Sequence, residues 1–310
     1  MSIVVFGSIN MDLVVRSPRL PQPGETIIGY DFMTIPGGKG ANQAVAAAKL
    51  GVSTQMVGRV GADDFGQTLV ETLRGYGVGC DRLTVDPHSP SGIALIEVDA
   101  AGNNHIIVVP GANGQVGADE LEALTALLAS AQILLLQLEL PLGAVVTAAE
   151  LAHQHGVRVI LDPAPVQSLP TTLYPLIDIL TPNRTEAEQL TGRTIECVED
   201  AIATAQILHQ WGVKIAIVTL GEEGVVVVSD RLVQHFPAFT VEVVDTVAAG
   251  DAFNGGLAGG LLQNLSLEQA IIWGMATAAL AVTQPGAQPA IPNAQTLLTF
   301  LSQNYKDKIN

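Results

Sequence analysis

Short runs of apolar residues alternate with helical segments through most of the second half of the chain. The runs carry almost no polar residues, which is the pattern of strands buried on both faces of a sheet. We expect strands over Ile133–Leu138, Val157–Leu161, Ile177–Leu180, Ile215–Thr219 and Val225–Ser229, and helices over Ala118–Ser130, Leu142–His155 and Asp200–Trp211. This alternation predicts an α/β fold in which helices cover both faces of a mainly parallel sheet.

The first half begins in the same way and then changes. Ile3–Gly7 and Thr54–Val60 read as buried strands, and Phe65–Tyr76 as an amphipathic helix. Three further β runs, Glu25–Ile35, Ser91–Val98 and His105–Val109, are more polar, and the last two flank a hairpin turn. We therefore expect one domain over residues 1–310, with a small antiparallel sheet inserted by about residues 13–36 and 88–111.

Composition limits the partners of this chain. Hydrophobic residues make up 48% of its 310 residues, which is enough for a sizeable core, and its net charge is −16. This acidity argues against nucleic acid and anionic membranes as partners, because both need a basic face. The two cysteines, Cys80 and Cys197, and the absence of a basic leader before the first strand lead us to expect a cytoplasmic protein.

The segment Val241–Gly260 carries the strongest sign of chemistry. A β-branched run, Val241–Val244, predicts a strand, small residues follow in the turn Val247–Gly250, and Asp251 opens a helix rich in Gly and Ala. Backbone N–H groups at such a helix start, together with the helix dipole, form an anion site. Asp251 then has two interpretations: a helix N-cap, or a base that orients a hydroxyl for attack on a phosphoryl group.

A second glycine-rich entry to a helix lies near the start of the chain. The loop Gly37–Gln43 precedes an Ala-rich helix, Ala44–Leu50, but it is not a Walker A loop because Gly40 follows Lys39. Asn10 and Asp12 follow the first buried strand. Ligands of open parallel sheets bind at that end of the strands, although an ordinary polar turn is the simpler interpretation of these two residues.

These motifs together resemble those of the PfkB-type carbohydrate kinases, and of the ribokinases most closely. The likeness covers nearly the whole chain and rests on Gly37–Gln43, Asp245–Asp251, Gly7–Asp12, Pro23–Thr26, Gln137–Glu139, Asp162–Pro165, Thr181–Asn183, Glu186–Glu188 and Gly286–Pro289. It implies a ribokinase-like three-layer α/β sandwich with a mainly parallel central sheet and a small antiparallel β lid. It also implies transfer of the ATP γ-phosphoryl group to the 5-hydroxyl of D-ribose.

The resemblance assigns roles to individual positions. Asp251 would be the catalytic base, and the N–H groups of Ala248, Ala249 and Gly250 would form the anion hole. The sugar would be held by Asn10, Asp12, Gly38, Lys39, Asn42 and Glu139, together with Asp251. ATP would lie along Asn183, Thr219, Gly221, Gly224 and Gly250.

The same resemblance implies two cations and a second subunit. Asn183 and Glu186 would act on Mg²⁺ and phosphates through water. Backbone carbonyls around Asp245, Val247, Val282 and Ala287 would hold an activating K⁺. Two chains would pair through the lid, which would cover its exposed strand edges.

Two positions depart from the pattern of the family. Arg184 stands where many ribokinases have an acidic residue and adds a positive charge near the expected phosphate region. Ala290 stands where a serine often follows Gly-Ala-Gln-Pro. The alternatives left open are a kinase of the same fold for fructose, deoxyribose or a nucleoside such as adenosine, and a non-catalytic sugar or nucleotide sensor.

Overall fold

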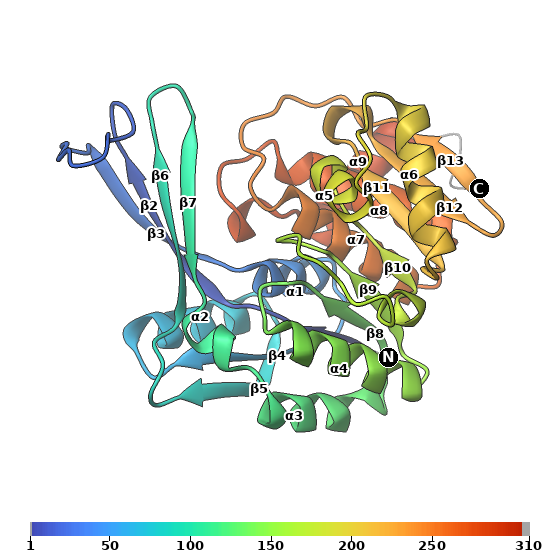
Figure 1. Cartoon of the computed structure of the whole chain (residues 1–310), viewed down its shortest axis with the longest axis horizontal. Helices are drawn as coiled ribbons and strands as arrows, with labels where there is room; N and C mark the ends of the chain where they lie inside the picture. Colours follow the sequence, from blue (N-terminus) through green and yellow to red (C-terminus); the bar gives the residue numbers. More distant parts are fainter. Residues whose placement is uncertain (1, 306–310) are drawn as a thin grey trace.

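The computed structural model describes residues 2–305 and is built around one large twisted sheet (Figure 1). The strand order is β13-β12-β11-β10-β9-β8-β1-β4-β5, and the strands from β11 to β5 run parallel. Their bounds are β1 Ser2–Phe6, β4 Thr54–Gly61, β5 Gly79–Asp86, β8 Ala131–Leu136, β9 Arg158–Leu161, β10 Ile179–Leu180, β11 Ile215–Thr219, β12 Val225–Ser229 and β13 Val233–Phe236. The hairpin β12–β13 is antiparallel and closes one edge.

Helices cover both faces of this sheet. Successive residues of β1 enter opposite cores: Ile3 and Val5 pack on one side, Val4 and Phe6 on the other. The first core is shared with α1 Lys39–Lys49, α2 Asp64–Gly75, α7 Ala249–Leu262, α8 Leu267–Ala281 and α9 Ala294–Asn304. The second is shared with α3 Ala118–Leu128, α4 Leu142–Gln154, α5 Arg184–Thr191 and α6 Val198–Gln210. The expected three-layer α/β fold is confirmed.

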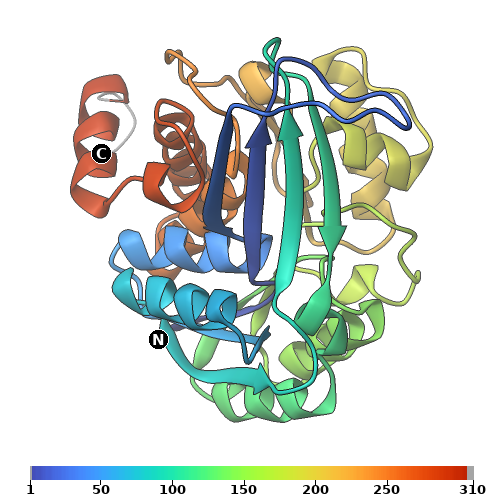
Figure 2. The same cartoon turned by 90° about the vertical axis from the view of Figure 1, so that its left-hand side faces the viewer.

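A separate four-stranded sheet stands beside the carboxyl edge of the large one. Its order is β3-β2-β6-β7, with bounds β2 Asn10–Arg16, β3 Asp31–Gly37, β6 Gly92–Val98 and β7 Asn104–Val109. Figure 2 shows these strands side by side, turned toward the viewer. The two outer pairs are antiparallel, as expected for the lid, whereas the central pair, β2 and β6, is parallel. Both strands leave the large sheet at the same edge, which gives them the same direction.

Some local predictions fail for identifiable reasons. Glu25–Ile35 is a strand only from Asp31, because residues 21–30 form no ladder with a neighbour. Val241–Val244 is not a strand: Val243 and Val244 are each 59% exposed and lie outside both sheets. Val244 and the following Asp245 instead donate their N–H groups to the carbonyl of Val282, which follows α8. Strand β5 was not expected at all.

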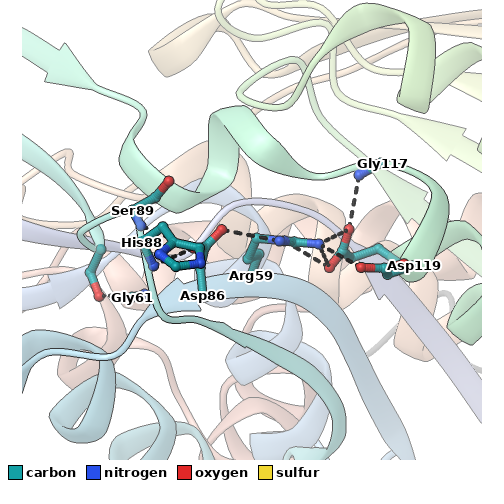
Figure 3. Close-up of polar contacts among 9 residues, drawn as sticks. Arg59, Gly61, Asp86, His88, Ser89, Gly117 and Asp119 are labelled. Carbon is teal, nitrogen blue, oxygen red and sulfur yellow. Dashed lines mark hydrogen bonds and ion pairs between the residues drawn. The ribbon is translucent and has the colours of Figure 1, made fainter.

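Charged side chains anchor the linker that joins β5 to the small sheet. Arg59 of β4 donates to Asp86 Oδ2 at 3.0 Å and to both carboxylate oxygens of Glu120 at 2.9 and 3.2 Å. Asp86 Oδ1 accepts from the N–H groups of His88 and Ser89 (Figure 3). These donors and Arg59 hold the pKa of Asp86 below its usual range. The root of β6 is thereby tied to the frame of the large sheet.

Within residues 2–305, every helix is too short or too polar to cross a membrane.

Candidate active site

The turn before α7 exposes backbone donors at the carboxyl edge of the large sheet. Ala248 has a left-handed conformation, φ 59°, and acts as the N-cap residue of α7 without a side-chain cap. The N–H of Ala249 donates to Thr246 O at 3.3 Å, whereas the N–H groups of Ala248 and Gly250 meet no acceptor in the described chain. Free N–H groups at a helix start attract anions. Asp251 lies two residues inside the helix, so the N-cap interpretation of Asp251 is wrong.

The Asp251 carboxylate is buried and held by two amides of α1. Asn42 Nδ2 donates to Oδ2 at 3.0 Å, and Gln43 Nε2 donates to Oδ1 at 3.1 Å. Burial raises the pKa of Asp251 to about 6, while Lys39 and the two amide donors act in the opposite direction. A carboxylate with this pKa is mostly ionised at neutral pH and is a stronger base than an exposed one.

The N-terminus of α1 brings the expected sugar-binding groups to Asp251. Gly38, with φ 90°, turns the chain into the helix, and a Cβ there would lie 2.7 Å from the N atom of Asn10. The N–H of Lys39 donates to Glu139 Oε2 at 3.1 Å, and the hydroxyl of Ser8 donates to the same oxygen. Lys39 and Asn42 of α1 therefore lie close to Glu139, which follows β8, although the two segments are far apart in the sequence.

Asn10 and Asp12 are the first and third residues of β2, beside this point. The Asn10 side chain is oriented by Asn113, whose Nδ2 donates to Asn10 Oδ1 at 2.8 Å. Gly37 of the neighbouring strand makes room for Asp12, because a Cβ at Gly37 would lie 2.4 Å from Asp12 Oδ2. Burial, followed by the charges of Glu139 and Asp251, raises the pKa of Asp12 to about 7.

One ammonium group faces several carboxylates in this site. Burial disfavours the charged form of Lys39, but Asp251, Asp162, Glu139 and Glu186 outweigh it, and the pKa of Lys39 is raised. Burial likewise raises the pKa of Asp162 well above its usual value. The surplus of acceptors over donors suits a ligand that carries several hydroxyl groups, because each hydroxyl donates a hydrogen bond.

A cavity of about 200 Å³ extends from these groups toward α5. Its lining includes Lys39, Asp251 and the Thr246–Gly250 turn, together with Asn183, Glu186 and Thr219 from the expected nucleotide side. Asn183 forms a parallel bridge with Thr219, which joins the start of α5 to the end of β11. The arrangement places the Asp251 carboxylate and the turn before α7 on the wall of one cavity.

Not every expected nucleotide residue lines that cavity. Asn183 and Glu186 form a reciprocal capping box at the start of α5, and burial raises the pKa of Glu186. Gly221 and Gly224 lie outside the cavity, in a short 3₁₀ turn, Gly221–Glu223 and its flank. The structure requires a glycine at position 224, since a Cβ there would lie 2.0 Å from Phe236 O.

Arg184 does not bring a free charge to the phosphate region. Its guanidinium forms an ion pair with Glu223 and donates to Ile195 O at 2.9 Å. The extra positive charge expected from the sequence is therefore compensated by a neighbouring carboxylate.

The loops expected to hold K⁺ lie next to each other. The Asp245 carboxylate accepts from the N–H of Val247 at 3.0 Å and from the N–H of Gly286 at 2.9 Å. The Val282 carbonyl accepts from Val244 and Asp245 at 2.8 and 3.2 Å, and the Ala287 carbonyl accepts from Ala290 at 3.2 Å. The Val282 oxygen uses both lone pairs in this conformation.

Several residues of the site were not predicted. Asn113, Gln43, Asp162 and Gln288 are all buried and hydrogen-bonded around Asp251 or Asn10. Thr181, Thr246 and Asn254 line the cavity. Gln43, Asp162 and Thr246 lie inside the motifs that carry the family resemblance. Their polar side chains within these motifs were the signal from which a role in the site could have been predicted. Asn113 and Asn254 lie outside those motifs.

The site combines a buried carboxylate at a helix N-terminus with side chains that accept hydrogen bonds from hydroxyl groups, at the carboxyl edge of a parallel sheet. This combination is that of a kinase of small polyhydroxylated molecules. Comparison with known proteins identifies the group. The model of the pfkB family carbohydrate kinases matches residues 1–294, and the chain belongs to that family. The resemblance inferred from the motifs is confirmed.

Individual relatives match along nearly their full length. The chain is 40% identical to the ribokinase of Haemophilus influenzae over 300 residues, 97% of this chain and 98% of that one. It is 36% identical to the deoxyribokinase of Salmonella typhimurium, over 98% of this chain and 100% of that one. The structure of Arabidopsis thaliana ribokinase complexed with ribose and ATP superposes with a TM-score of 0.90, at 36% identity over 97% of this chain and 98% of that chain.

Proposed function

We propose that this chain transfers the γ-phosphoryl group of ATP to the 5-hydroxyl of D-ribose, giving ribose 5-phosphate and ADP. The observation that carries the proposal is the place of Asp251. Its carboxylate lies between the N-terminal donors of α7 and the hydroxyl-binding groups of α1 and β2. The ribokinase names of relatives at this identity, and a ribokinase complexed with ribose and ATP, support the same acceptor and donor.

The residues perform the reaction through positioning and charge. Asp251 accepts the proton of the 5-hydroxyl while the hydroxyl oxygen forms a bond to the γ-phosphorus. The bond between the γ-phosphorus and the β–γ bridging oxygen breaks, and ADP leaves with that oxygen. The transition state is loose, so a carboxylate of moderate basicity suffices. The N–H groups of Ala248 and Gly250 meet the charge on the transferred group, and Ala249 joins them if it releases Thr246 O.

The sugar hydroxyls are recognised by the groups around the start of α1. An ionised Asp12 accepts from two vicinal hydroxyls, and Glu139 accepts from another, while Asn10, Asn42 and the ammonium of Lys39 donate. Gly38 lets the sugar approach the backbone. Asp12 contacts the sugar before and during the reaction, so it contributes mainly to affinity.

Mg²⁺ fits this site only as part of the nucleotide complex. In the described chain no three His, Cys, Asp or Glu residues gather as ligands. Glu186, with Asn183, lines the cavity and would reach the ion through water, while the phosphates supply the direct oxygens. The bound ion neutralises phosphate charge.

We further propose K⁺ as an activator, bound by carbonyls around Asp245, Val247, Val282 and Ala287. The Asp245 carboxylate already joins two of these loops through Val247 and Gly286. Val282 would have to release at least one of its two N–H partners to serve as a ligand. A cation there would stiffen the turn that carries the Ala248 and Gly250 donors.

The test is ADP release, measured by a coupled assay with ribose, 2-deoxyribose, fructose, adenosine and fructose 6-phosphate as acceptors. We expect the highest kcat/KM with ribose. Faster turnover of 2-deoxyribose would favour the second candidate, for which the similarity to deoxyribokinase speaks. Sugar binding without ADP release would indicate a sensor.

A further inference from the structure

Each oxygen of Asp251 accepts a hydrogen bond from a side-chain amide, and the oxygen of each of these amides accepts a hydrogen bond from a further glutamine. Gln137 Nε2 donates to Gln43 Oε1 at 2.7 Å, and Gln288 Nε2 donates to Asn42 Oδ1 at 3.1 Å. An amide whose oxygen accepts a fixed donor must present its NH₂ group on the other side. Two directed chains therefore converge on the carboxylate, Gln137 through Gln43 and Gln288 through Asn42.

Stability alone does not explain this arrangement. Gln43, Gln137 and Gln288 are no more than 1% exposed, and the Oε1 atoms of Gln137 and Gln288 find no partner in the described chain. A buried acceptor without a partner destabilises the folded state, and apolar side chains of similar shape avoid that cost. The fold retains two such acceptors around one carboxylate.

Gln43 also separates two carboxylates. Its Nε2 donates to Asp162 Oδ2 at 2.9 Å as well as to Asp251 Oδ1 at 3.1 Å. Both hydrogens of one amide are thus used on two acids, and neither acid needs to share a proton with the other. Gln43 and Gln288 are buried, at 0% and 1% exposed, so they act on the substrates through Asp251 and Asn42, to which they donate.

We propose that Gln43 and Gln288 are positioning residues of the phosphoryl transfer, which aim the Asp251 carboxylate at the acceptor hydroxyl through these two amide chains. The inference rests on the proposed function, in which Asp251 is the base. A carboxylate free to rotate about its Cβ–Cγ bond loses the alignment that proton transfer needs, and small misplacements in an active site cost about 10²-fold in rate.

The variants Gln43→Met and Gln288→Met keep length and burial but remove the amide. We expect kcat to fall by about 10–100-fold in each, while the KM for the sugar changes by less than about threefold, because alignment matters most in the transition state. Gln137→Met, which leaves Gln43 present but unoriented, should give a smaller loss. The matched control is Val45→Ala in the same helix, which should lower the melting temperature and leave kcat unchanged.

A second readout separates aiming from packing. Asp251 faces Lys39 on one side and Asp12, Glu139 and Asp162 on the others, and its two amide donors favour the ionised form. Loss of one donor should therefore move the acid limb of kcat/KM, and the titration of the Asp251 carboxyl carbon followed by ¹³C NMR, to higher pH. Val45→Ala should move neither.

Two outcomes are decisive. If the wild type is active and both methionine variants retain more than half of its kcat, with an unchanged acid limb, Gln43 and Gln288 do not position the base. If the wild type phosphorylates no acceptor in the panel, the proposed function fails. The NMR titration then decides by itself whether the two amides control Asp251.

Discussion

At the scale of single residues, the site concentrates negative charge around one ammonium group. Asp12, Glu139, Asp162 and Asp251 all act on Lys39 or on one another. Such clustering destabilises the folded state at neutral pH, and proteins accept that cost where a ligand later supplies the missing donors. The hydroxyl groups of a sugar are donors of this kind.

Asp251 should be indispensable for turnover. Asp251→Asn removes the proton acceptor, and we expect kcat in the ADP-release assay to fall by about 10²–10⁴-fold. An asparagine also offers only one oxygen to Asn42 and Gln43, so one of these amides will face an NH₂ group. The melting temperature of the variant should therefore be measured alongside the activity. A variant that is folded and retains more than about a tenth of kcat contradicts the assignment of the base.

Asp12 should lower stability at neutral pH. Its pKa of about 7 lies above the usual value, so between about pH 4 and 7 the folded chain holds a proton that the unfolded chain releases. Stability therefore falls as pH rises through this range. We expect Asp12→Asn to stabilise the protein by about 1–4 kcal/mol above pH 7 and to have no such effect near pH 4.

The measurement is thermal or urea unfolding of wild type and Asp12→Asn from pH 4 to 8. Glu150→Gln, on the exposed face of α4, is the control for removing one negative charge. A stability difference between Asp12→Asn and wild type that does not vary with pH would refute the argument. The same variant should raise the KM for the sugar more than that for ATP.

At the scale of secondary structure, the sequence predicts elements well where burial on both faces imposes a continuous apolar run. The strands around Ile3, Ile133 and Ile215 follow this rule and were placed within two residues at each end. The run Val241–Val244 is also rich in β-branched residues but lies outside both sheets. Whether such a run forms a strand depends on a neighbouring strand with which it can pair, and no local sequence pattern contains that information. The amide chains of Gln137 and Gln288 escape prediction for the same reason, because they join residues far apart in the sequence.

The Arg59 cluster should be the main anchor of the β5–β6 linker. Arg59→Met leaves Glu120, whose side chain is 0% exposed, without its cation. Breaking a buried pair in this way costs about 3–5 kcal/mol, which urea unfolding would detect. The double variant with Glu120→Gln should recover part of the loss. Lys214→Met, which removes an exposed ion pair with Asp178, should cost less than about 1 kcal/mol.

Position 290 offers a test of the cation loop. Ala290 is buried in a 3₁₀ turn, Gln288–Ala290, directly after the loop proposed to bind K⁺. We expect K⁺ to activate the wild type and to half-saturate Ala290→Ser at a lower concentration, because serine adds a hydroxyl ligand. The initial rate is measured against KCl at constant ionic strength. Equal half-saturation would exclude position 290 as a ligand, and a flat response in both would exclude the cation site.

At the scale of the whole molecule, the small sheet has an uncovered apolar edge. Ile106, Ile107, Val108 and Val109 of the edge strand β7 are 44–59% exposed, and Phe32 of β3 is 60% exposed. Four consecutive exposed apolar residues next to unpaired backbone groups favour association with another strand. We therefore propose that two chains associate through this strand, as the family resemblance implies.

Light scattering coupled to size-exclusion chromatography tests this assembly. We expect the wild type to elute as a dimer and Ile107→Glu as a monomer, because a buried unpaired carboxylate opposes association. Val233→Glu is the control, since Val233 is 54% exposed on β13, the edge strand at the far end of the large sheet. A monomeric wild type, or a dimeric Ile107→Glu, places the interface elsewhere or removes it.

The direct passage from β1 into β2 has a mechanical consequence. Only Gly7–Ile9 separates the two strands, so a rotation of the small sheet would have its pivot beside Ile9. Along the strand, Asp12 lies about 10 Å from Ile9, whereas Arg16 lies about 23 Å from it. A rotation that displaces Arg16 by a given amount would therefore displace Asp12 by less than half as much. If the small sheet rotates to admit a sugar, Asp12 would therefore move much less than the tip of the sheet.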